Sequence, residues 1–289
     1  MLSRTFAKQF VILGILSFFA YNNLCAQVAM SIKSNRKNYH QYERPYLLLT
    51  LNNYSGTSLI FGSTKDLSGT VTIRIKKPGT YNDMTEDFIK LELDNFILKP
   101  GVPYNLKIDL GKYLSLGKVG SYKLKAILTH GNLASGYESN YIFFSVSKGF
   151  YVWETTVGTP TLPGQAVGEK VATISYKLDS MFDGKDKVYY FLVEDAKRVY
   201  RVARIGVDYG IAAPQCRVDF LSRAHILIQD SSKIFSYFVY DTSGELIKHH
   251  VYKKVSASTP YLGLDESTGS IRVLGGDMAR KGIDFDVEN

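Results

Sequence analysis

The sequence predicts an all-β protein, and three of its features carry this prediction. Tyrosine and phenylalanine are abundant, with 21 and 16 copies among 289 residues, and both residue types favour strands. Short segments alternate apolar and polar side chains between Gly, Asn, Asp and Ser positions, which is typical of antiparallel strands. No stretch longer than about two turns repeats with a helical period. The chain length further favours two domains over one.

The first 26 residues have the three parts of a secretory signal peptide. Arg4 and Lys8 make a positive start, Phe10–Ala20 is an apolar run, and an A-x-A-like pattern ends at Ala26. We expect cleavage after this alanine and therefore a secreted or periplasmic protein. A lipid anchor on Cys25 is the rival interpretation, although a leucine stands where a bacterial lipobox has a small residue.

Composition narrows the function classes of the exported chain. Cys216 is the only cysteine after the predicted cleavage site, so no internal disulfide is expected and the core must hold the fold. No later stretch reaches the roughly 20 apolar residues of a transmembrane segment. The formal charge is +8, densest in RIKK (74–77) and around KHH (248–250). A mild basic excess of this kind favours contact with anionic envelope polymers, but solvated strand faces are the default interpretation. No nucleic-acid-binding motif occurs.

About seven strands are predicted between residues 28 and 148. Their ranges are 28–33, 42–61 with a turn at 53–56, 69–79, 84–96, 96–110 with a break at 100–101, 120–130 and 140–148. The segment 69–79 alternates cleanly, with Val71, Ile73 and Ile75 on one face and polar side chains on the other. The segments 42–61 and 96–110 each suggest a strand, a turn and a returning strand.

The order of these strands resembles a known class of domain. The motifs Y-x-x-x-E-R-P-Y-L-L-L-T-L-N-N-Y-S-G, L-K-P-G, G-S-Y-K-L-K-A and S-N-Y-I-F-F-S-V follow one another, as in the Ig-like domains of exported bacterial proteins. The resemblance implies a β-sandwich over residues 27–148, with Tyr122 as a tyrosine corner whose hydroxyl bonds to upstream backbone. It implies little about function, because such sandwiches have many roles.

A change in composition near Gly149 marks the expected domain boundary. Residues 148–170 contain four glycines, two prolines and the only tryptophan, and Pro160–Gly168 is typical of an ordered loop or a hinge. Trp153 lies in an alternating strand pattern. We expect it to pack in an inter-domain core, and stacking on a ligand is the alternative.

A weak repeat runs through the predicted second domain, residues 149–289. The segments 187–206, 223–244 and 269–287 each read as an apolar strand, a polar turn and a second strand. With a period of roughly 45 residues, they resemble the blades of β-propellers in secreted proteins. Fewer than three full blades fit, so we expect an incomplete propeller-like antiparallel domain or a compact barrel. Half of an oligomeric ring is a further alternative.

The five histidines of the chain include the candidate metal ligands His225, His249 and His250. Neighbouring side chains on a strand point to opposite faces, so His249 and His250 should diverge, with His249 on the apolar side and His250 towards solvent. His225 could join one of them if the strands align, but no carboxylate or cysteine partner is indicated. Ordinary sheet histidines are therefore expected, with no metal and no cofactor.

Two acidic motifs are also interpreted as structural. DTSG (Asp241–Gly244) is similar to the aspartic protease motif, but it occurs once and has serine in place of the glycine. Between two strands it predicts a hairpin turn. Asp284, Asp286 and Glu288 could hold a cation on one strand face, although a solvated tail is the expected state. Hydrolase, phosphate-loop and dinucleotide fingerprints do not occur.

These features favour a non-enzymatic binding or envelope-assembly module whose partner is a protein or an envelope polymer. The alternative is a hydrolase acting on glycans or peptides, or an accessory domain of one. It would need carboxylates to converge in a cleft between domains, and the candidates are Glu194, Asp195, Asp219 and Asp230. Exposed sheet edges would favour self-association of the chain.

Overall fold

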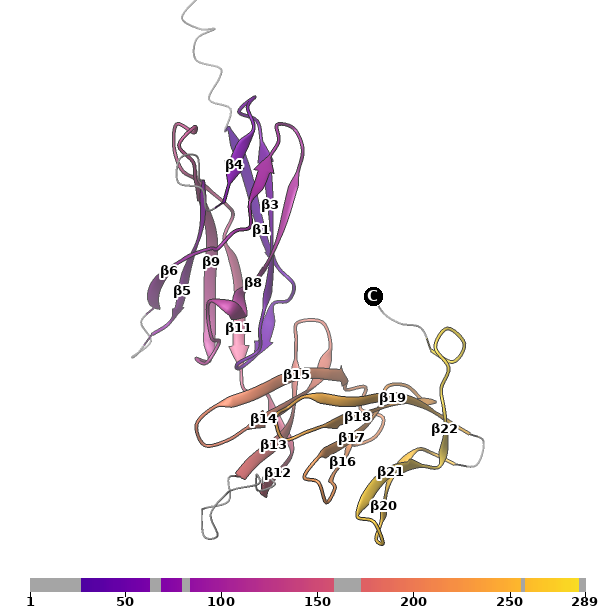
Figure 1. The fold of residues 1–289 in the computed structure, drawn as a ribbon. Coiled ribbons are helices and arrows are strands. Elements are labelled where there is room, and N and C mark those ends of the chain that lie inside the picture. The colour runs from indigo at the N-terminus through magenta and orange to yellow at the C-terminus, as the bar shows by residue number, and fades with distance from the viewer. Residues whose placement is uncertain (1–26, 63–68, 80–83, 159–172, 256–257, 286–289) are drawn as a thin grey trace, which may run out of the picture. The chain divides into compact units, whose positions relative to one another are not determined.

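The computed structural model describes residues 27–62, 69–79, 84–158, 173–255 and 258–285 (Figure 1). These residues form strands and one short 3-10 helix, so the all-β prediction is confirmed. They divide into two compact units. Unit 1 comprises the described residues up to Asn35 with Tyr46–Tyr113 and Tyr122–Phe143, and unit 2 comprises Arg36–Pro45, Leu114–Ser121 and the chain from Phe144. The domain limits 27–148 and 149–289 stay predictions. The predicted signal peptide and the segment Pro160–Gly168 lie outside the described residues.

Unit 1 consists of antiparallel sheets. Its elements are β1 (Val28–Ser34), β3 (Tyr46–Asn53), β4 (Leu59–Phe61), β5 (Thr70–Pro78), β6 (Met84–Lys90), β7 (Phe96–Leu98), β8 (Tyr104–Asp109), the 3-10 helix η1 (Leu110–Lys112), most of β9 (Gly120–Thr129), β10 (Tyr137–Glu138) and the start of β11 (Ile142–Ser147). One sheet has the order β1-β3-β8, another contains β9-β5-β6 with β10 beside β9, and β4 pairs with β7. Val71, Ile73 and Ile75 of β5 are fully buried, as the alternation predicts.

The two returning strands predicted in unit 1 do not form hairpins. β3 pairs with β1 and β8, whereas β4 pairs with β7. The buried Asn53 explains this exchange of partners. Its side-chain nitrogen donates to the carbonyls of Thr57 and Leu98 at 2.7 and 2.9 Å, and its side-chain oxygen accepts from the Ser55 amide at 2.9 Å. These bonds direct the chain out of the first sheet at the predicted turn.

Unit 2 is a layered set of antiparallel meanders. Its elements are β2 (Asn38–His40), which pairs in parallel with β11, then β12 (Phe150–Gly158), β13 (Thr173–Phe182), β14 (Lys187–Glu194), β15 (Val199–Val207), β16 (Gln215–Val218), β17 (Ala224–Gln229), β18 (Ile234–Tyr240), β19 (Leu246–Lys254), β20 (Tyr261–Asp265), β21 (Ser270–Leu274) and β22 (Gly276–Met278). One sheet has the order β12-β13-β14-β15, a second has β16-β17-β18-β19-β22, and β20 pairs with β21.

Four consecutive strands in up-and-down order are the plan of a propeller blade. Both large sheets of unit 2 follow this plan, so the unit is propeller-like, and its sheets are open. The hairpins predicted at 187–206 and 223–244 are confirmed as β14-β15 and β17-β18. The hairpin predicted at 269–287 is wrong, because β21 pairs back with β20 and β22 joins the edge of β19.

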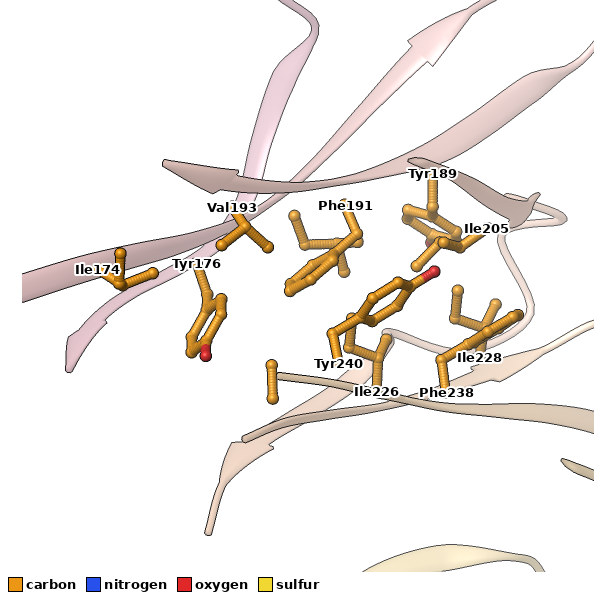
Figure 2. Packing of buried hydrophobic residues seen from close by; sticks show 12 residues of the cluster. Ile174, Tyr176, Tyr189, Phe191, Val193, Ile205, Ile226, Ile228, Phe238 and Tyr240 are labelled. Carbon is orange, nitrogen blue, oxygen red and sulfur yellow. The ribbon is translucent and has the colours of Figure 1, made fainter. Parts of the chain in front are cut away.

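The core of unit 2 lies between its two large sheets (Figure 2). Phe191 of β14 is fully buried, and its ring stacks on Tyr240 of β18 with centroids 4.7 Å apart. Tyr176 of β13 stacks on the same phenylalanine at 5.7 Å. Trp153 and Val157 of β12 pack against this cluster. Burial of several large aromatic rings at one contact is the main source of stability for the layer.

A second apolar cluster covers the other face of the sheet that contains β17 and β18. Leu262 of β20 and Ile271 of β21 pack there against Leu227, Tyr237 and Val239. Both faces of these two central strands are therefore buried, which explains their nearly continuous apolar sequences. The hairpin β20-β21 thus shields this face of strands β17 and β18 from solvent.

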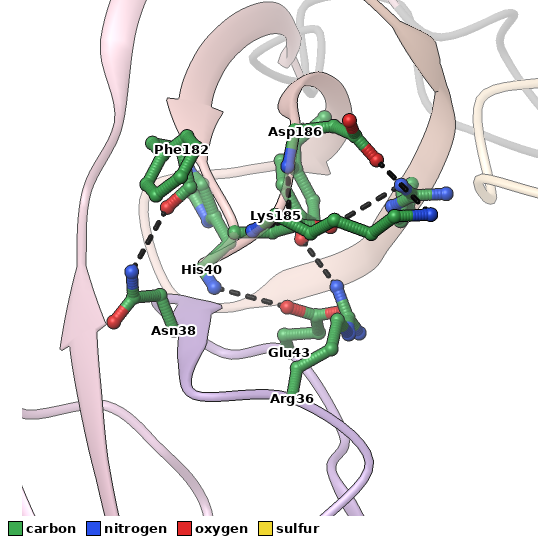
Figure 3. Close-up of polar contacts among 10 residues, drawn as sticks. Arg36, Asn38, His40, Glu43, Phe182, Lys185 and Asp186 are labelled. Atoms are coloured by element: carbon green, nitrogen blue, oxygen red, sulfur yellow. Dashed lines mark hydrogen bonds and ion pairs between the residues drawn. The ribbon is translucent and has the colours of Figure 1, made fainter.

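A polar cluster within unit 2 connects the segment around β2 to the ends of β13 and β14 (Figure 3). The His40 ring is buried, with Nε2 3.1 Å from Asp179 Oδ2 and Nδ1 2.9 Å from the Gln41 carbonyl oxygen. Glu43 accepts from the His40 amide at 3.0 Å and pairs with the Arg36 guanidinium, which also donates to the Tyr190 hydroxyl at 2.6 Å. The cluster therefore combines a buried histidine with a hydrogen-bonded carboxylate.

This cluster predicts a pH-dependent contribution to stability. Burial acts to lower the pKa of His40, but the Asp179 and backbone hydrogen bonds raise it above its usual value overall. The contribution of protonated His40 is therefore complete below the unfolded pKa of about 6.5 and is lost as the pH rises through the higher folded pKa. Replacement of His40 with glutamine should consequently lower the unfolding free energy more near pH 5.5 than near pH 8.

Urea unfolding followed by tryptophan fluorescence tests this expectation, because the only tryptophan packs in unit 2. The variant Asp179→Asn is the control, since without the carboxylate the His40→Gln change should cost nearly the same at both pH values. Equal losses from His40→Gln in the wild-type background at both pH values would contradict the assignment.

Candidate binding face

His225, a weak candidate metal ligand, is held in place by hydrogen bonds within unit 2. It is buried on β17, with Nδ1 2.6 Å from the Tyr237 hydroxyl and Nε2 3.0 Å from Asp219 Oδ2. Burial lowers the pKa of His225 below its usual value, which favours the neutral form of the ring. Asp219 also accepts from Arg223 Nε at 2.7 Å. The His225 ring thus connects the turn at Asp219–Arg223 to strand β18, and each of its two ring nitrogens has a hydrogen-bond partner.

His249 and His250 diverge from one another on β19, as predicted, but their exposure is the reverse of the prediction. His249 is exposed and stacks flat on Phe238 at 4.5 Å, whereas His250 is half-buried near Tyr252. Which side of an outer strand is covered depends on the neighbouring layer and not on the alternation. Among the described residues, no group of three or more His, Cys, Asp or Glu side chains is arranged to hold a metal ion.

The other single residues considered from the sequence have local roles. Trp153 is half-buried and packs on the core of unit 2. Burial raises the pKa of the Cys216 thiol to about 12, so it is an unreactive thiol at neutral pH. Tyr122 is buried, as a corner tyrosine would be. Asp286 and Glu288 lie outside the described residues.

The four carboxylates considered for a hydrolase are each used locally. Glu194 pairs with Lys177 at 2.6 Å, and Asp195 accepts from the Tyr200 hydroxyl at 2.6 Å. Asp219 binds Arg223 and His225, as described above. Asp230 is half-buried and accepts from Ser236 Oγ at 2.5 Å, and burial raises its pKa. No two of them share a hydrogen-bond partner among these contacts.

DTSG forms the predicted hairpin turn. Asp241 Oδ1 accepts from the amides of Ser243 and Glu245 at 2.9 and 2.8 Å. Gly244 has a φ of +81°, and a Cβ at this position would lie 2.6 Å from Arg201 Cβ, so glycine is required. Asp284 in the acidic tail pairs with Lys253 at 3.0 Å.

The outer face of the sheet β9-β5-β6 in unit 1 gathers aromatic rings and cations, and we call it the aromatic–basic face. Its members are Arg74 and Lys76 of β5, Glu86, Phe88 and Lys90 of β6, Lys123 and Lys125 of β9, Glu138 of β10, and the nearby Tyr141 and Phe143. Arg74 is the direct neighbour of Phe88 on one side and of Lys125 on the other. Because β5 turns its valine and isoleucines inwards, Arg74 and Lys76 point outwards, and so do their direct neighbours on β6 and β9.

Cations lie over the aromatic rings of this face. Lys123 Nζ is 3.9 Å from the ring centroid of Tyr141 and 5.4 Å from that of Phe143. The Arg74 guanidinium is 5.7 Å from the ring centroid of Phe88. Phe88 and Phe143 are nevertheless 61% and 62% exposed, which is high for phenylalanine. Exposed rings grouped on one sheet face make this face a candidate interaction surface.

Ion pairs within the aromatic–basic face hold its charged side chains in place. Arg74 forms a two-point contact with Glu86, through Nε at 2.5 Å and Nη2 at 2.9 Å, and this contact lowers the pKa of Glu86. Lys125 donates to Glu138 at 2.5 Å, which raises the pKa of the lysine. The face has five basic and two acidic members, so it keeps a positive excess with its side chains held in place.

The sequence indicates parts of this face but not the whole. RIKK stood out as a basic segment, and the alternation of β5 predicted an outward polar row. The register of β5 with β6 and β9 joins this row to Phe88 and Lys125, and that register is a tertiary property. The exposed rings could have been suspected from Phe88 and Phe143, which stand at polar positions of alternating strands.

No protein-family model matches the chain, and no curated protein matches it. Among solved structures, it is similar to the alkylpurine DNA glycosylase AlkC of Pseudomonas fluorescens bound to DNA containing an abasic site analog (12% identity, 42% of this chain, 30% of that chain, TM-score 0.29). It is also similar to a mutant β-glucosidase of Listeria innocua in complex with laminaribiose (9% identity, 42% of this chain, 16% of that chain, TM-score 0.25).

A third similar structure is the sporulation control protein Spo0M of Bacillus subtilis (8% identity, 79% of this chain, 91% of that chain, TM-score 0.26). The chain spans less than a third of the length of the first two proteins. At these TM-scores none of the three likenesses carries an argument about this chain. Within the part of the chain that the structure describes, no helix has the length and apolar character needed to cross a membrane.

Proposed function

We propose that the chain is an exported, non-enzymatic binding module that holds an anionic polysaccharide of the cell envelope on its aromatic–basic face. The observation that carries this proposal is the group of exposed rings and ordered cations on one face of unit 1. Flat rings offer apolar area to the carbon faces of sugar rings, and the positive excess complements carboxylate or sulfate groups.

Export and an Ig-like sandwich in the N-terminal part belong to the same proposal. The signal-peptide pattern supports export, and the antiparallel sheets of unit 1 with the buried Tyr122 support the sandwich. Expression with the full leader in a secreting bacterial host tests the first part. A mature protein whose first residue is Gln27 is the expected product, and retention of the leader or lipid on Cys25 would contradict it.

The alternative hydrolase function has no observation in its favour. Glu194, Asp195, Asp219 and Asp230 serve in ion pairs, turns and a buried hydrogen bond. A carboxylate pair that works as acid and base needs both groups directed at one substrate bond, and none of these contacts places two of the four together.

Replacement of Phe143 with alanine should weaken binding of a sulfated polysaccharide by about tenfold, as expected for an aromatic anchor in a binding surface. Heparin is a suitable probe of this ligand class, and isothermal titration of the purified chain gives the dissociation constant. The affinity should also fall as salt rises, because the ionic part of the interaction is screened.

Phe220→Ala is the matched control, because Phe220 is a similarly exposed phenylalanine (66%) of unit 2. It should leave heparin binding unchanged. Neutral dextran should bind weakly or not at all. Equal binding by wild type and Phe143→Ala, or equal binding of dextran and heparin, would overturn the proposal.

A further inference from the structure

β12 is an edge strand of unit 2 that carries a bulge between Tyr151 and Trp153 and pairs regularly with β13 from Trp153 to Gly158. It is nine residues long and pairs with β13 on one side, and no described strand pairs with its other side. An unpaired edge offers backbone donors and acceptors to a further strand. We propose that β12 pairs in antiparallel orientation with β12 of a second copy of this chain, which joins two four-stranded sheets into one. This inference is independent of the proposed polysaccharide binding.

Two other edge strands of the chain carry more charge than β12. β15, at the opposite edge of the same sheet, carries Arg201 and Arg204, and the edge strand β6 carries Glu86, Asp87 and Lys90. Charged side chains of this kind oppose pairing between edges. The sequence of β12, FYVWETTVG, has a single charge.

That single charge is partly offset within the sheet. Glu154 Oε1 lies 3.4 Å from Lys177 Nζ of the adjacent strand β13, and this lysine also pairs with Glu194 at 2.6 Å. The rest of β12 is aromatic, β-branched or small, which is the composition that favours strand pairing. Phe150 is 76% exposed, the largest value for a large apolar side chain among the described residues, and Tyr151 is 70% exposed.

The sequence of β12 fits a second copy of itself in one particular register. A two-fold axis at Thr155 places Glu154 of each copy opposite Thr156 of the other, and Trp153 opposite Val157. A two-fold axis at Glu154 would instead place the two glutamates opposite each other, which is unfavourable. The register about Thr155 pairs polar with polar and apolar with apolar positions, as an isologous interface requires.

Two substitutions at one position test this register. Thr156→Glu places a glutamate opposite Glu154 twice in the dimer, whereas Thr156→Lys creates two pairs of opposite charge. Both changes remove the same 3.0 Å contact between Thr156 and Ser175, so their difference reports on the partner strand. We expect Thr156→Glu to raise the dimer dissociation constant about fivefold and Thr156→Lys to leave it unchanged or lower it.

Sedimentation velocity over a wide concentration range at about 0.15 M salt measures the dissociation constants, and circular dichroism confirms that each variant is folded. Thr85→Glu on the edge strand β6, where Thr85 is also exposed, should leave the dimer unchanged. A wild-type chain that remains monomeric would overturn the proposal. Equal effects of the glutamate and lysine variants would overturn it as well.

Discussion

Replacement of Phe191 with alanine should lower the unfolding free energy of unit 2 by about 3–5 kcal/mol. The Phe191 ring is fully buried between the two large sheets and stacks on Tyr176 and Tyr240. Alanine would remove the apolar ring and leave a cavity whose walls are rings of opposite layers. These walls cannot collapse without moving whole strands, so the loss should fall near the upper part of the range.

Tryptophan fluorescence during urea unfolding is the appropriate measurement. Trp153 packs against the same cluster as Phe191, so its emission reports the unfolding of this unit. Phe182→Ala is the matched control, because Phe182 lies at the end of the neighbouring strand β13 and is 56% exposed. It should cost less than about 1 kcal/mol. Similar losses for the two variants would contradict the assignment of Phe191 to the central core.

Replacement of Asp219 with alanine should lower the unfolding free energy of unit 2 by about 3 kcal/mol, which is the second large effect. The Asp219 side chain is fully buried and accepts from the Leu221 and Arg223 amides, the Arg223 side chain and His225. Its removal leaves a guanidinium and a buried imidazole without their acceptor. We place the cost at the lower end of the range for broken buried pairs, because the Arg223 side chain is partly exposed.

Asp241→Ala provides a closely matched control for Asp219→Ala. Asp241 accepts from amides two and four residues later, the same turn pattern, but it has no arginine or histidine partner in these bonds. The Asp241→Ala replacement should lower the unfolding free energy by about 1 kcal/mol. The difference between the two variants therefore isolates the bonds to Arg223 and His225. Equal costs would show that the turn alone explains the role of Asp219.

The pH dependence of the Asp219 contribution has a defined sign. Burial acts to raise the pKa of Asp219, but the bonds to Arg223 and His225 lower it overall. A lowered carboxylate pKa contributes stability that is present above the unfolded value of about 3.9 and is lost as the pH falls through the folded value. The difference in unfolding free energy between wild type and Asp219→Ala should therefore become smaller as the pH falls into the acid range.

Several elements were predictable because local pattern and tertiary environment agree. β5 alternates apolar and polar residues, and one of its faces is covered while the other is open, so the period of two survives in the fold. The hairpins β14-β15 and β17-β18 were predictable because their turns are short and rich in polar turn formers. The turn at Asp241 followed from the chemistry of Asp and Gly alone.

Other features depended on which layer covers which face. His249 and His250 alternate as expected, yet the exposed one is His249, because neighbouring layers and not the alternation decide which side is covered. The strand after Asn53 leaves its sheet because a buried side chain binds the carbonyls of Thr57 and Leu98, the latter 45 residues away. No local signal in the sequence specifies such a distant partner.

The sequence by itself determined the all-β class, most strand positions, the inward row of β5 and the turn chemistry, since each depends on neighbours within a few residues. Only the tertiary structure decided the strand partners, the closed environment of His225 and the grouping of Phe88, Arg74, Lys125 and Tyr141 on one face. Those properties depend on register between strands distant in the chain, and a shift of one residue would turn every side chain of a strand to the opposite face.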